Sequence, residues 1–166
     1  MRCIYLIGFM GSGKTTVAKE TGQLLGWRVI DLDQEIEERF GRISDIFKRK
    51  GEHAFRCFES EVLEAVRGDD IIVSTGGGIV ENKKNVDYMN YNGYVIHLQA
   101  SFKEISKRLK NDTDRPLWNN GQKKQRELYT KRLSLYHQAA HFNLSTDCQT
   151  PEEIACQIAK LSKSFE

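Results

Sequence analysis

Short apolar runs alternate along this chain with longer stretches that carry apolar residues at helical spacing. The predicted strands lie at residues 3–7, 28–30, 71–74, 94–98 and 143–145. The predicted helices lie at residues 15–25, 52–66, 83–91, 102–110, 126–140 and 152–162. Strands that alternate with helices are typically parallel and joined by right-handed crossovers, so the sheet is covered by helices on both faces. The sequence therefore predicts an α/β fold whose ligands bind beyond the carboxyl ends of the strands.

The composition is typical of one folded domain over residues 1–166. Hydrophobic residues make up 39% and charged residues 29%, and no linker-like stretch or internal repeat divides the chain. The formal net charge is only +2, so any attraction to anions must come from local clusters. No apolar run approaches the roughly 18 residues needed to span a bilayer, and the first residues are typical of a buried strand rather than a secretory signal. We expect a cytoplasmic protein without a membrane partner.

The four cysteines show no metal-binding pattern. Cys3, Cys57, Cys148 and Cys156 form no CxxC pair, and the four histidines complete no zinc spacing. Four cysteines are compatible with two disulfides, but the chain carries no secretory signal. We therefore expect reduced thiols in a cytosolic protein.

A glycine-rich segment follows the first predicted strand directly. Residues 8–15, GFMGSGKT, match G-x-x-x-x-G-K-[ST] in full, with a strand before them and a helix after them. Glycines let successive N–H groups turn inward around a phosphate, and the helix N-terminus adds a partial positive charge. Lys14 can then reach the β- and γ-phosphates, and the Thr15 hydroxyl can coordinate Mg²⁺. The segment predicts a nucleoside triphosphate with Mg²⁺, bound by Gly11, Ser12, Gly13, Lys14, Thr15 and Thr16.

Two aspartates lie at the end of the second predicted strand. Asp31 and Asp33 are two residues apart, so in an extended chain their side chains point to the same side. One carboxylate can hold the metal shell while the other accepts a hydrogen bond from an attacking hydroxyl. The alternative is that one of them, Asp33 in particular, caps a helix that begins near Gln34. Because both lie beside a phosphate loop, we favour the functional interpretation.

Arg56 lies between two phenylalanines on a helical pattern. An arginine in such a place either pairs with a nearby glutamate, here Glu59 or Glu52, or projects its planar guanidinium into a cavity. Three consecutive glycines at residues 76–78 end the third predicted strand. Because glycines are costly to order, three of them indicate that a small polar ligand approaches the backbone closely.

Residues 101–132 form the most basic segment, with ten Lys or Arg against four Asp or Glu. The middle of this segment is rich in turn-forming residues and suits a basic loop that closes over an anionic ligand. A solvated pair of helices joined by a turn explains the composition equally well. Nucleic acid is a poor partner for the segment, because the positive charge is local and no pattern of stacking aromatic residues accompanies it.

The segments GFMGSGKT, DLD, FR, STGGG, RPLW and KRLSLY occur in this order over nearly the whole chain, and together they resemble the shikimate kinase family. The resemblance implies a P-loop kinase of the nucleoside monophosphate kinase-like fold, a three-layer α/β/α structure with a five-stranded parallel sheet in the order 2-3-1-4-5. It also implies a lid at about 111–124 and a substrate-binding region at about 32–60. The implied reaction transfers the γ-phosphoryl group of ATP to shikimate, a step toward the aromatic amino acids, in an enzyme that we expect to be a monomer.

The resemblance also implies roles for single residues on the nucleotide side. Lys14 and Thr15 match the phosphate and Mg²⁺ positions, and Asp31 resembles the aspartate near the metal. Arg115, in RPLW, resembles the lid arginine that contacts the transferred phosphate. The adenine would lie against Arg108 and near Gln149, although the adenine loop lacks an arginine that some members carry.

On the acceptor side, Asp33 resembles the aspartate that binds the substrate hydroxyls and receives the catalytic role together with Lys14 and Arg115. The carboxylate of shikimate would be held by Arg56, Arg132, Gly76, Gly77 and Gly78. Two positions depart from the family pattern: Leu32 replaces a small hydroxylated residue, and Ser134 replaces a proline. Neither departure removes a charged group.

Two other functions compete with this prediction. A kinase of the same fold that acts on gluconate or a nucleoside monophosphate would share the phosphate loop, but the glycine run and the paired arginines fit a rigid cyclic acid better. A guanine-nucleotide switch without a small-molecule acceptor would need an N-K-x-D motif. The only NK in the chain, in ENKKN, lacks that aspartate.

Overall fold

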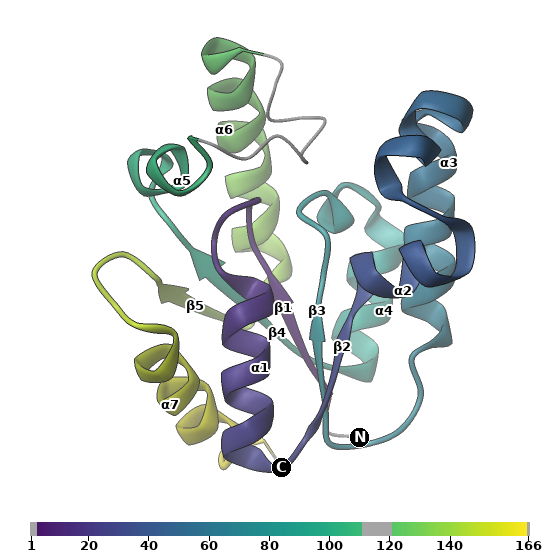
Figure 1. The fold of residues 1–166 in the computed structure, drawn as a ribbon. Helices are drawn as coiled ribbons and strands as arrows, with labels where there is room; N and C mark the ends of the chain where they lie inside the picture. Colours follow the sequence, from purple (N-terminus) through teal and green to yellow (C-terminus); the bar gives the residue numbers. More distant parts are fainter. Residues whose placement is uncertain (1–2, 111–120, 166) are drawn as a thin grey trace.

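The computed structural model of this protein describes residues 3–110 and 121–165. Its centre is one sheet of five parallel strands in the order β2-β3-β1-β4-β5 (Figure 1). The strands are β1 (Cys3–Ile7), β2 (Arg28–Asp31), β3 (Ile71–Ser74), β4 (Gly93–Gln99) and β5 (Phe142–Ser145). The predicted α/β class and the predicted strand order are both confirmed.

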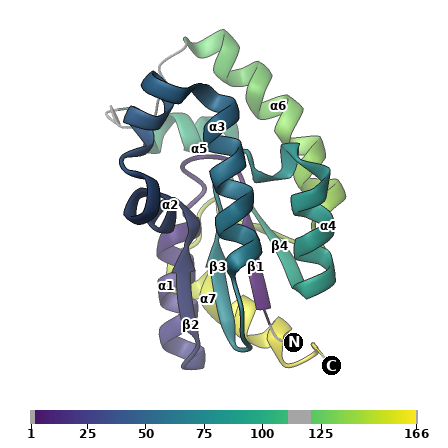
Figure 2. The same cartoon turned by 90° about the vertical axis from the view of Figure 1, so that its right-hand side faces the viewer.

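Helices cover both faces of the sheet (Figure 2). Around the sheet lie α1 (Lys14–Leu25), α2 (Leu32–Phe40), α3 (Ile43–Ala65), the 3₁₀ turn η1 (Ile79–Glu81), α4 (Lys83–Asn92), α5 (Phe102–Arg108), α6 (Gln122–Ala139) and α7 (Pro151–Ser162). α1 and α7 pack on one face, and α3, α4 and α6 pack on the other. The three predicted layers are therefore present.

The central strand β1 explains why the chain needs helices on both faces. Its five residues are all buried, and successive side chains point to opposite faces of the sheet. Ile4 and Leu6 enter the core beneath α1 and α7, whereas Tyr5 and Ile7 enter the core beneath α3, α4 and α6. A strand that is apolar on both faces belongs in the middle of a parallel sheet.

The clearest departure from the predicted elements is the stretch between β2 and β3. The sequence predicted a helix only from residue 52, but α3 already begins at Ile43, and α2 precedes it. Gly51 lies inside α3 at φ 82° and ψ 173°, a kink that joins two helical pieces. Glycine adopts this conformation without a steric penalty, so the chain can kink here between the two helical pieces.

The segment predicted as a lid, 111–124, lies mostly outside the described residues. Its last residues are described and are helical, because α6 begins at Gln122 rather than at the predicted residue 126. At the other end of the chain, α7 starts at Pro151, one residue before the predicted start, with this proline in its first turn. Thr150 and Glu153 form a reciprocal capping box there.

The four cysteines, Cys3, Cys57, Cys148 and Cys156, are all free thiols. Across residues 3–110 and 121–165, none of the helices is long and apolar enough to cross a bilayer.

Candidate active site

The predicted site residues come from distant parts of the sequence and gather at one edge of the sheet. The glycine loop follows β1, Asp31 ends β2 and the run Gly76–Gly78 follows β3, so all three leave the carboxyl ends of neighbouring strands (Figure 1). α6 adds Arg132 over the same edge. In a parallel α/β sheet this edge is where ligands bind.

The loop between β1 and α1 requires glycine at three positions. Gly11 and Gly13 have φ angles of 79° and 93°, values that favour glycine. At Gly8 an added Cβ would lie 2.5 Å from the carbonyl oxygen of Leu98. Gly13 is also the N-cap of α1, so the loop delivers the chain directly to a helix N-terminus. This arrangement suits a bound phosphate, because unpaired N–H groups and the helix dipole point to the same place.

Lys14 lies folded against the loop that precedes it. Its ammonium group donates to the carbonyl oxygens of Gly8 at 2.7 Å and Phe9 at 3.0 Å, and the residue is only 8% exposed. The positive charge is therefore held at the centre of the loop. A phosphate that entered the loop would meet this charge without a large rearrangement.

Three oxygen-bearing side chains meet between α1, β2 and β3. The Thr15 hydroxyl donates to Oδ2 of Asp31 at 2.7 Å and lies 3.3 Å from the hydroxyl of Ser74. Hydroxyl and carboxylate oxygens are the donors that Mg²⁺ prefers. These three side chains therefore fit a divalent cation. Ser74 is the one of the three that the sequence analysis did not identify.

The two aspartates lie in different positions relative to α2 from those predicted. Asp31, not Asp33, caps α2, because its Oδ1 accepts hydrogen bonds from the backbone N–H groups of Asp33 at 3.1 Å and Gln34 at 3.2 Å. Asp33 already belongs to the first turn of α2, so the pair does not lie in one extended stretch. The expectation that extended spacing aligns their side chains was wrong. Because the cap at Asp31 starts α2, the chain is already helical at Asp33.

Asp33 lies beside the glycine run. An added Cβ at Gly76 would lie 3.3 Å from Oδ1 of Asp33 and would overlap the carboxylate of Glu59. Only a glycine lets the strand leave the sheet between these two carboxylates. Glu59 is fully buried, and burial raises its pKa, with the neighbouring charge of Asp33 adding to that rise and the Arg56 guanidinium opposing it.

Arg56 forms both of the ion pairs considered in the sequence and also lies against the glycine run. Its Nη1 is 3.0 Å from Oε2 of Glu59, and its Nη2 is 3.2 Å from Oε1 of Glu52. A Cβ added to Gly78 would overlap this guanidinium. The ion pairs considered in the sequence are therefore confirmed, and the projection of Arg56 into a cavity stays a prediction.

Arg132 is the largest fully buried side chain of the described residues. Its Nε lies 3.4 Å from Oε1 of Glu81, its guanidinium lies over the ring of Phe9, and its Nη1 approaches Gly77. Burial alone would raise the pKa of Glu81, but the charges of Arg132 and Lys131 outweigh burial and hold that pKa below its usual value. Glu81 therefore stays ionised beside the buried arginine.

Further contacts seat α6 behind the glycine run. The hydroxyl of Tyr136 donates to the carbonyl oxygen of Gly77, and the ring of His97 stacks on Tyr136. Burial lowers the pKa of His97 to about 4, so this ring is neutral at physiological pH. The helix that carries Arg132 is thus fixed to the loop that follows β3.

The residues predicted beside adenine lie between α5 and the loop after β5. Arg108 donates to the carbonyl oxygens of Gly11 at 3.0 Å and Thr146 at 3.4 Å, so it joins the glycine loop to the segment before α7. Gln149 follows in that segment and donates to the carbonyl oxygen of Ser145. Arg115 lies outside the described residues.

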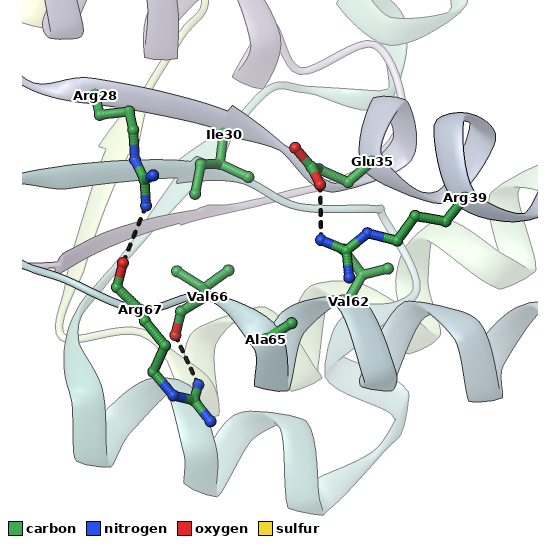
Figure 3. Close-up of a pocket in the computed structure, with 8 residues that line it drawn as sticks. All are labelled: Arg28, Ile30, Glu35, Arg39, Val62, Ala65, Val66 and Arg67. Carbon is green, nitrogen blue, oxygen red and sulfur yellow. Dashed lines mark hydrogen bonds and ion pairs between the residues drawn. The ribbon is translucent and has the colours of Figure 1, made fainter.

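A separate hollow of about 240 Å³ lies between β2, α2 and α3 (Figure 3). Arg39 pairs with Glu35 at one side of it, and Arg28 donates to the Arg67 carbonyl oxygen at the other. None of the predicted site residues lines this hollow. The candidate active site is therefore the edge of the sheet described above.

Comparison with known proteins agrees with this geometry. A family model described as shikimate kinase matches residues 10–163. The chain belongs to the shikimate kinase family. Shikimate kinase of Persephonella marina is 43% identical over 160 residues, which cover 95% of this chain and 97% of the relative. Shikimate kinase of Bacillus anthracis is 40% identical and covers 93% of this chain and 94% of its own.

Solved structures of the shikimate kinase family superpose on the whole fold. Shikimate kinase from Acinetobacter baumannii, in complex with shikimate, has a TM-score of 0.93 at 34% identity, covering 99% of this chain and 94% of that one. Shikimate kinase from Aquifex aeolicus has a TM-score of 0.84 at 29% identity, with 98% and 96% covered. Deoxyadenosine kinase from M. mycoides, at 18% identity and a TM-score of 0.66, shares the fold.

The predicted family, the P-loop kinase fold and the enzyme class are thereby confirmed. The activity predicted from the sequence, that of a shikimate kinase, agrees with the family and with curated relatives over nearly the full chain. A kinase of this family binds a nucleotide and a small-molecule acceptor.

Proposed function

We propose that this protein transfers the γ-phosphoryl group of ATP to the 3-hydroxyl of shikimate, giving 3-phosphoshikimate and ADP. The observation that carries the proposal is the position of Gly77. A Cβ added there would lie 3.3 Å from the backbone nitrogen of Met10 in the glycine loop and 3.5 Å from Nη1 of Arg132. One glycine thus separates a phosphate-binding loop from a buried cation that suits a carboxylate.

On the donor side, Lys14 is proposed to neutralise the negative charge of the β- and γ-phosphates. Mg²⁺ would be held by Thr15 and Asp31, next to Ser74, and when bound it neutralises charge on the phosphate oxygens. Arg108 and Gln149 are proposed as neighbours of the adenine.

The segment 111–124 is proposed as a lid. Because water is also a hydroxyl, closure before transfer limits the hydrolysis of ATP. Arg115 would then contact the transferred phosphate. This residue and most of the lid lie outside the described residues.

On the acceptor side, Asp33 is proposed to orient the attacking hydroxyl and to accept its hydrogen bond. Arg56 and Arg132 would hold the carboxylate of the acid, which lies against Gly76, Gly77 and Gly78. In-line phosphoryl transfer needs little covalent chemistry from a protein, so placement and charge neutralisation supply the catalysis. Asp33 lies close enough to Gly76 to share this acceptor pocket.

The proposal extends to the setting of the enzyme. We propose that residues 1–166 act as one monomeric domain in the cytoplasm, without a nucleic-acid or membrane partner. The formal net charge of only +2 supports the absence of a nucleic-acid partner, because the chain as a whole is not a polycation.

A coupled assay of ADP release tests the reaction directly. With ATP and Mg²⁺ present, we expect ADP release that saturates with added shikimate and stays at a low background without it. Gluconate and AMP serve as alternative acceptors, because each is the acceptor of a related kinase. Equal ADP release with and without shikimate, or faster release with gluconate or AMP, would contradict the proposal.

A further inference from the structure

We propose that Glu81 is a positioning residue for the acceptor: it holds Arg132 from behind, so that both terminal nitrogens of the guanidinium remain available to a carboxylate. This inference rests on the proposed function, since it concerns how the acid is bound. Glu81 itself belongs to none of the segments that carry the family resemblance.

Arg132 is a buried cation. Its side chain is 2% exposed, and a buried guanidinium is costly unless a carboxylate pairs with it. Within the described residues, Glu81 provides the one ion pair that Arg132 makes. The carboxylate therefore determines where this cation can rest before any ligand arrives.

The pairing of Arg132 with Glu81 uses the inner nitrogen of the guanidinium. Glu81 contacts Nε, the nitrogen nearest the chain, at 3.4 Å. Nη1 and Nη2 have no hydrogen-bond partner in the described part of the protein, and Nη1 lies toward Gly77. A carboxylate is bound in two-point fashion by a guanidinium edge, so contact at Nε leaves the edge formed by Nη1 and Nη2 open for the acid.

Glu81 belongs to the short helical turn that follows the glycine run. It ends η1, directly after the glycine run, and its backbone N–H donates to the carbonyl oxygen of Gly78 at 3.0 Å. Arg132 lies on α6, whose Tyr136 also bonds to Gly77. Glu81 therefore couples the two surfaces that would enclose the acid, the glycine run on one side and the arginine on the other.

The exposed neighbour Lys131 does not explain this arrangement. Its ammonium group also lies 3.2 Å from Oε1 of Glu81, but its side chain is 67% exposed and the pair is open to solvent. Solvent-exposed ion pairs stabilise proteins little. The contact that fixes a geometry is the one with the buried arginine.

The test is the substitution Glu81→Gln, which keeps the shape of the side chain and removes its charge. We expect the KM for shikimate to rise about tenfold, because an arginine that is no longer held loses part of its preorganisation. The kcat and the KM for ATP should stay within about twofold of wild type. Asp87→Asn is the matched control, because it removes a carboxylate from the exposed Lys83 pair on α4 and should change none of these constants.

A double-mutant cycle separates positioning from a general structural effect. In an Arg132→Lys background the Nε that Glu81 contacts is gone, so Glu81→Gln should change kcat/KM for shikimate by less than about twofold. If Glu81→Gln does not fold, which thermal unfolding shows, Glu81→Asp keeps the charge on a shorter side chain. We expect a rise of about threefold in the acceptor KM from that variant.

Each other outcome counts against the inference. An unchanged or lowered KM for shikimate would mean that Glu81 only neutralises Arg132 and competes with the acid. A tenfold effect that persists in the Arg132→Lys background would place the action of Glu81 elsewhere. If the wild-type protein itself releases no ADP in response to shikimate, the proposed function fails instead, and the two failures are therefore distinguishable.

Discussion

The two arginines assigned to the acid are held in opposite ways. Arg132 is buried and contacts Glu81 through Nε, which leaves its terminal nitrogens without a hydrogen bond to any residue of 3–110 or 121–165. Arg56 is 20% exposed, and both of its terminal nitrogens already contact carboxylates, Glu59 and Glu52. Arg132 is thus ready for a carboxylate, whereas Arg56 must exchange at least one partner to bind one. Binding energy is used most efficiently where the geometry exists beforehand, so the two residues should contribute unequally.

The difference follows from the origin of their partners. Glu52 and Glu59 lie one turn before and one turn after Arg56 on α3, so any stable helix brings them together. The partner of Arg132 comes from η1, which packs on α6 only in the complete fold. An ion pair between neighbours on one helix can form and break without any other change in the fold. An ion pair between two separate elements persists as long as those elements stay packed together.

The largest expected effect comes from replacing each arginine by lysine. Lysine cannot supply the planar two-point contact, so both variants should raise the KM for shikimate. We expect about 100-fold for Arg132→Lys and about tenfold for Arg56→Lys, with the KM for ATP changed by less than about threefold in each. Steady-state kinetics with either substrate varied measures this. Equal effects of the two variants on shikimate would break the comparison, and equal effects on both substrates would contradict the carboxylate role.

The next effect concerns the glycines against which the arginines lie. A Cβ at Gly78 would overlap the Arg56 guanidinium, whereas a Cβ at Gly77 would lie 3.5 Å from Nη1 of Arg132, an ordinary contact. We expect Gly78→Ala to raise the acceptor KM about fivefold, because the guanidinium must move. Its matched variant is Gly77→Ala, and a larger acceptor-KM effect there than at Gly78 would contradict this account.

A smaller effect, with the opposite sign, is expected at Glu52. This carboxylate is 48% exposed and occupies Nη2 of Arg56, where it competes with the acid. Exposed pairs of this kind are worth about 0.3–0.5 kcal/mol, so Glu52→Gln should lower the KM for shikimate about twofold. The change should shrink at high salt, which screens the competing charge. An increased KM would show that Glu52 positions Arg56 as Glu81 positions Arg132.

The smallest effect is a pH dependence that differs between the two partner carboxylates. Burial raises the pKa of Glu59 above its ordinary 4.5, so its contribution to the free energy of unfolding is full below pH 4.5 and is lost as the pH rises through the raised pKa. The pKa of Glu81 is lowered, so its contribution is present above pH 4.5 and is lost as the pH falls through the lowered pKa.

Urea unfolding of the wild type, Glu59→Gln and Glu81→Gln between pH 3.5 and 7.5 separates the two contributions. The advantage of the wild type over Glu59→Gln should decrease toward high pH, and its advantage over Glu81→Gln should decrease toward low pH. Parallel curves for the two variants would show that burial and nearby charge act alike at both sites.

The sequence was most informative where short-range rules decide the structure. The glycine loop and the buried strand β1 follow from spacing and residue type alone. The strand order came from the family resemblance instead. The stretch around α2 and α3 was harder, because the predicted helix began only at residue 52, whereas α3 extends back across the kink at Gly51. The role of Asp31 as a cap depended on where β2 ends, and boundaries are poorly specified by local sequence.

Contacts across the fold were beyond reach from the sequence. Glu59 was visible only as a possible surface partner of Arg56, although it is buried beside Gly76. No pattern drew attention to Glu81, since a single glutamate after a glycine run has no periodic signal. Its importance depends on α6, which lies about fifty residues further along the chain and returns to the same edge of the sheet.

The glycine run has a consequence for how such a site can diversify. Gly76 leaves room for Glu59 and Asp33, and Gly78 leaves room for Arg56. At both positions the missing side chain is therefore required by a charged neighbour. A larger residue in the run would displace an acid-binding group, and a smaller neighbour would leave a void behind the glycine. Acquiring a new acceptor would therefore require paired replacements in the run and on α3, and single substitutions in the run would mostly weaken binding of the present acceptor.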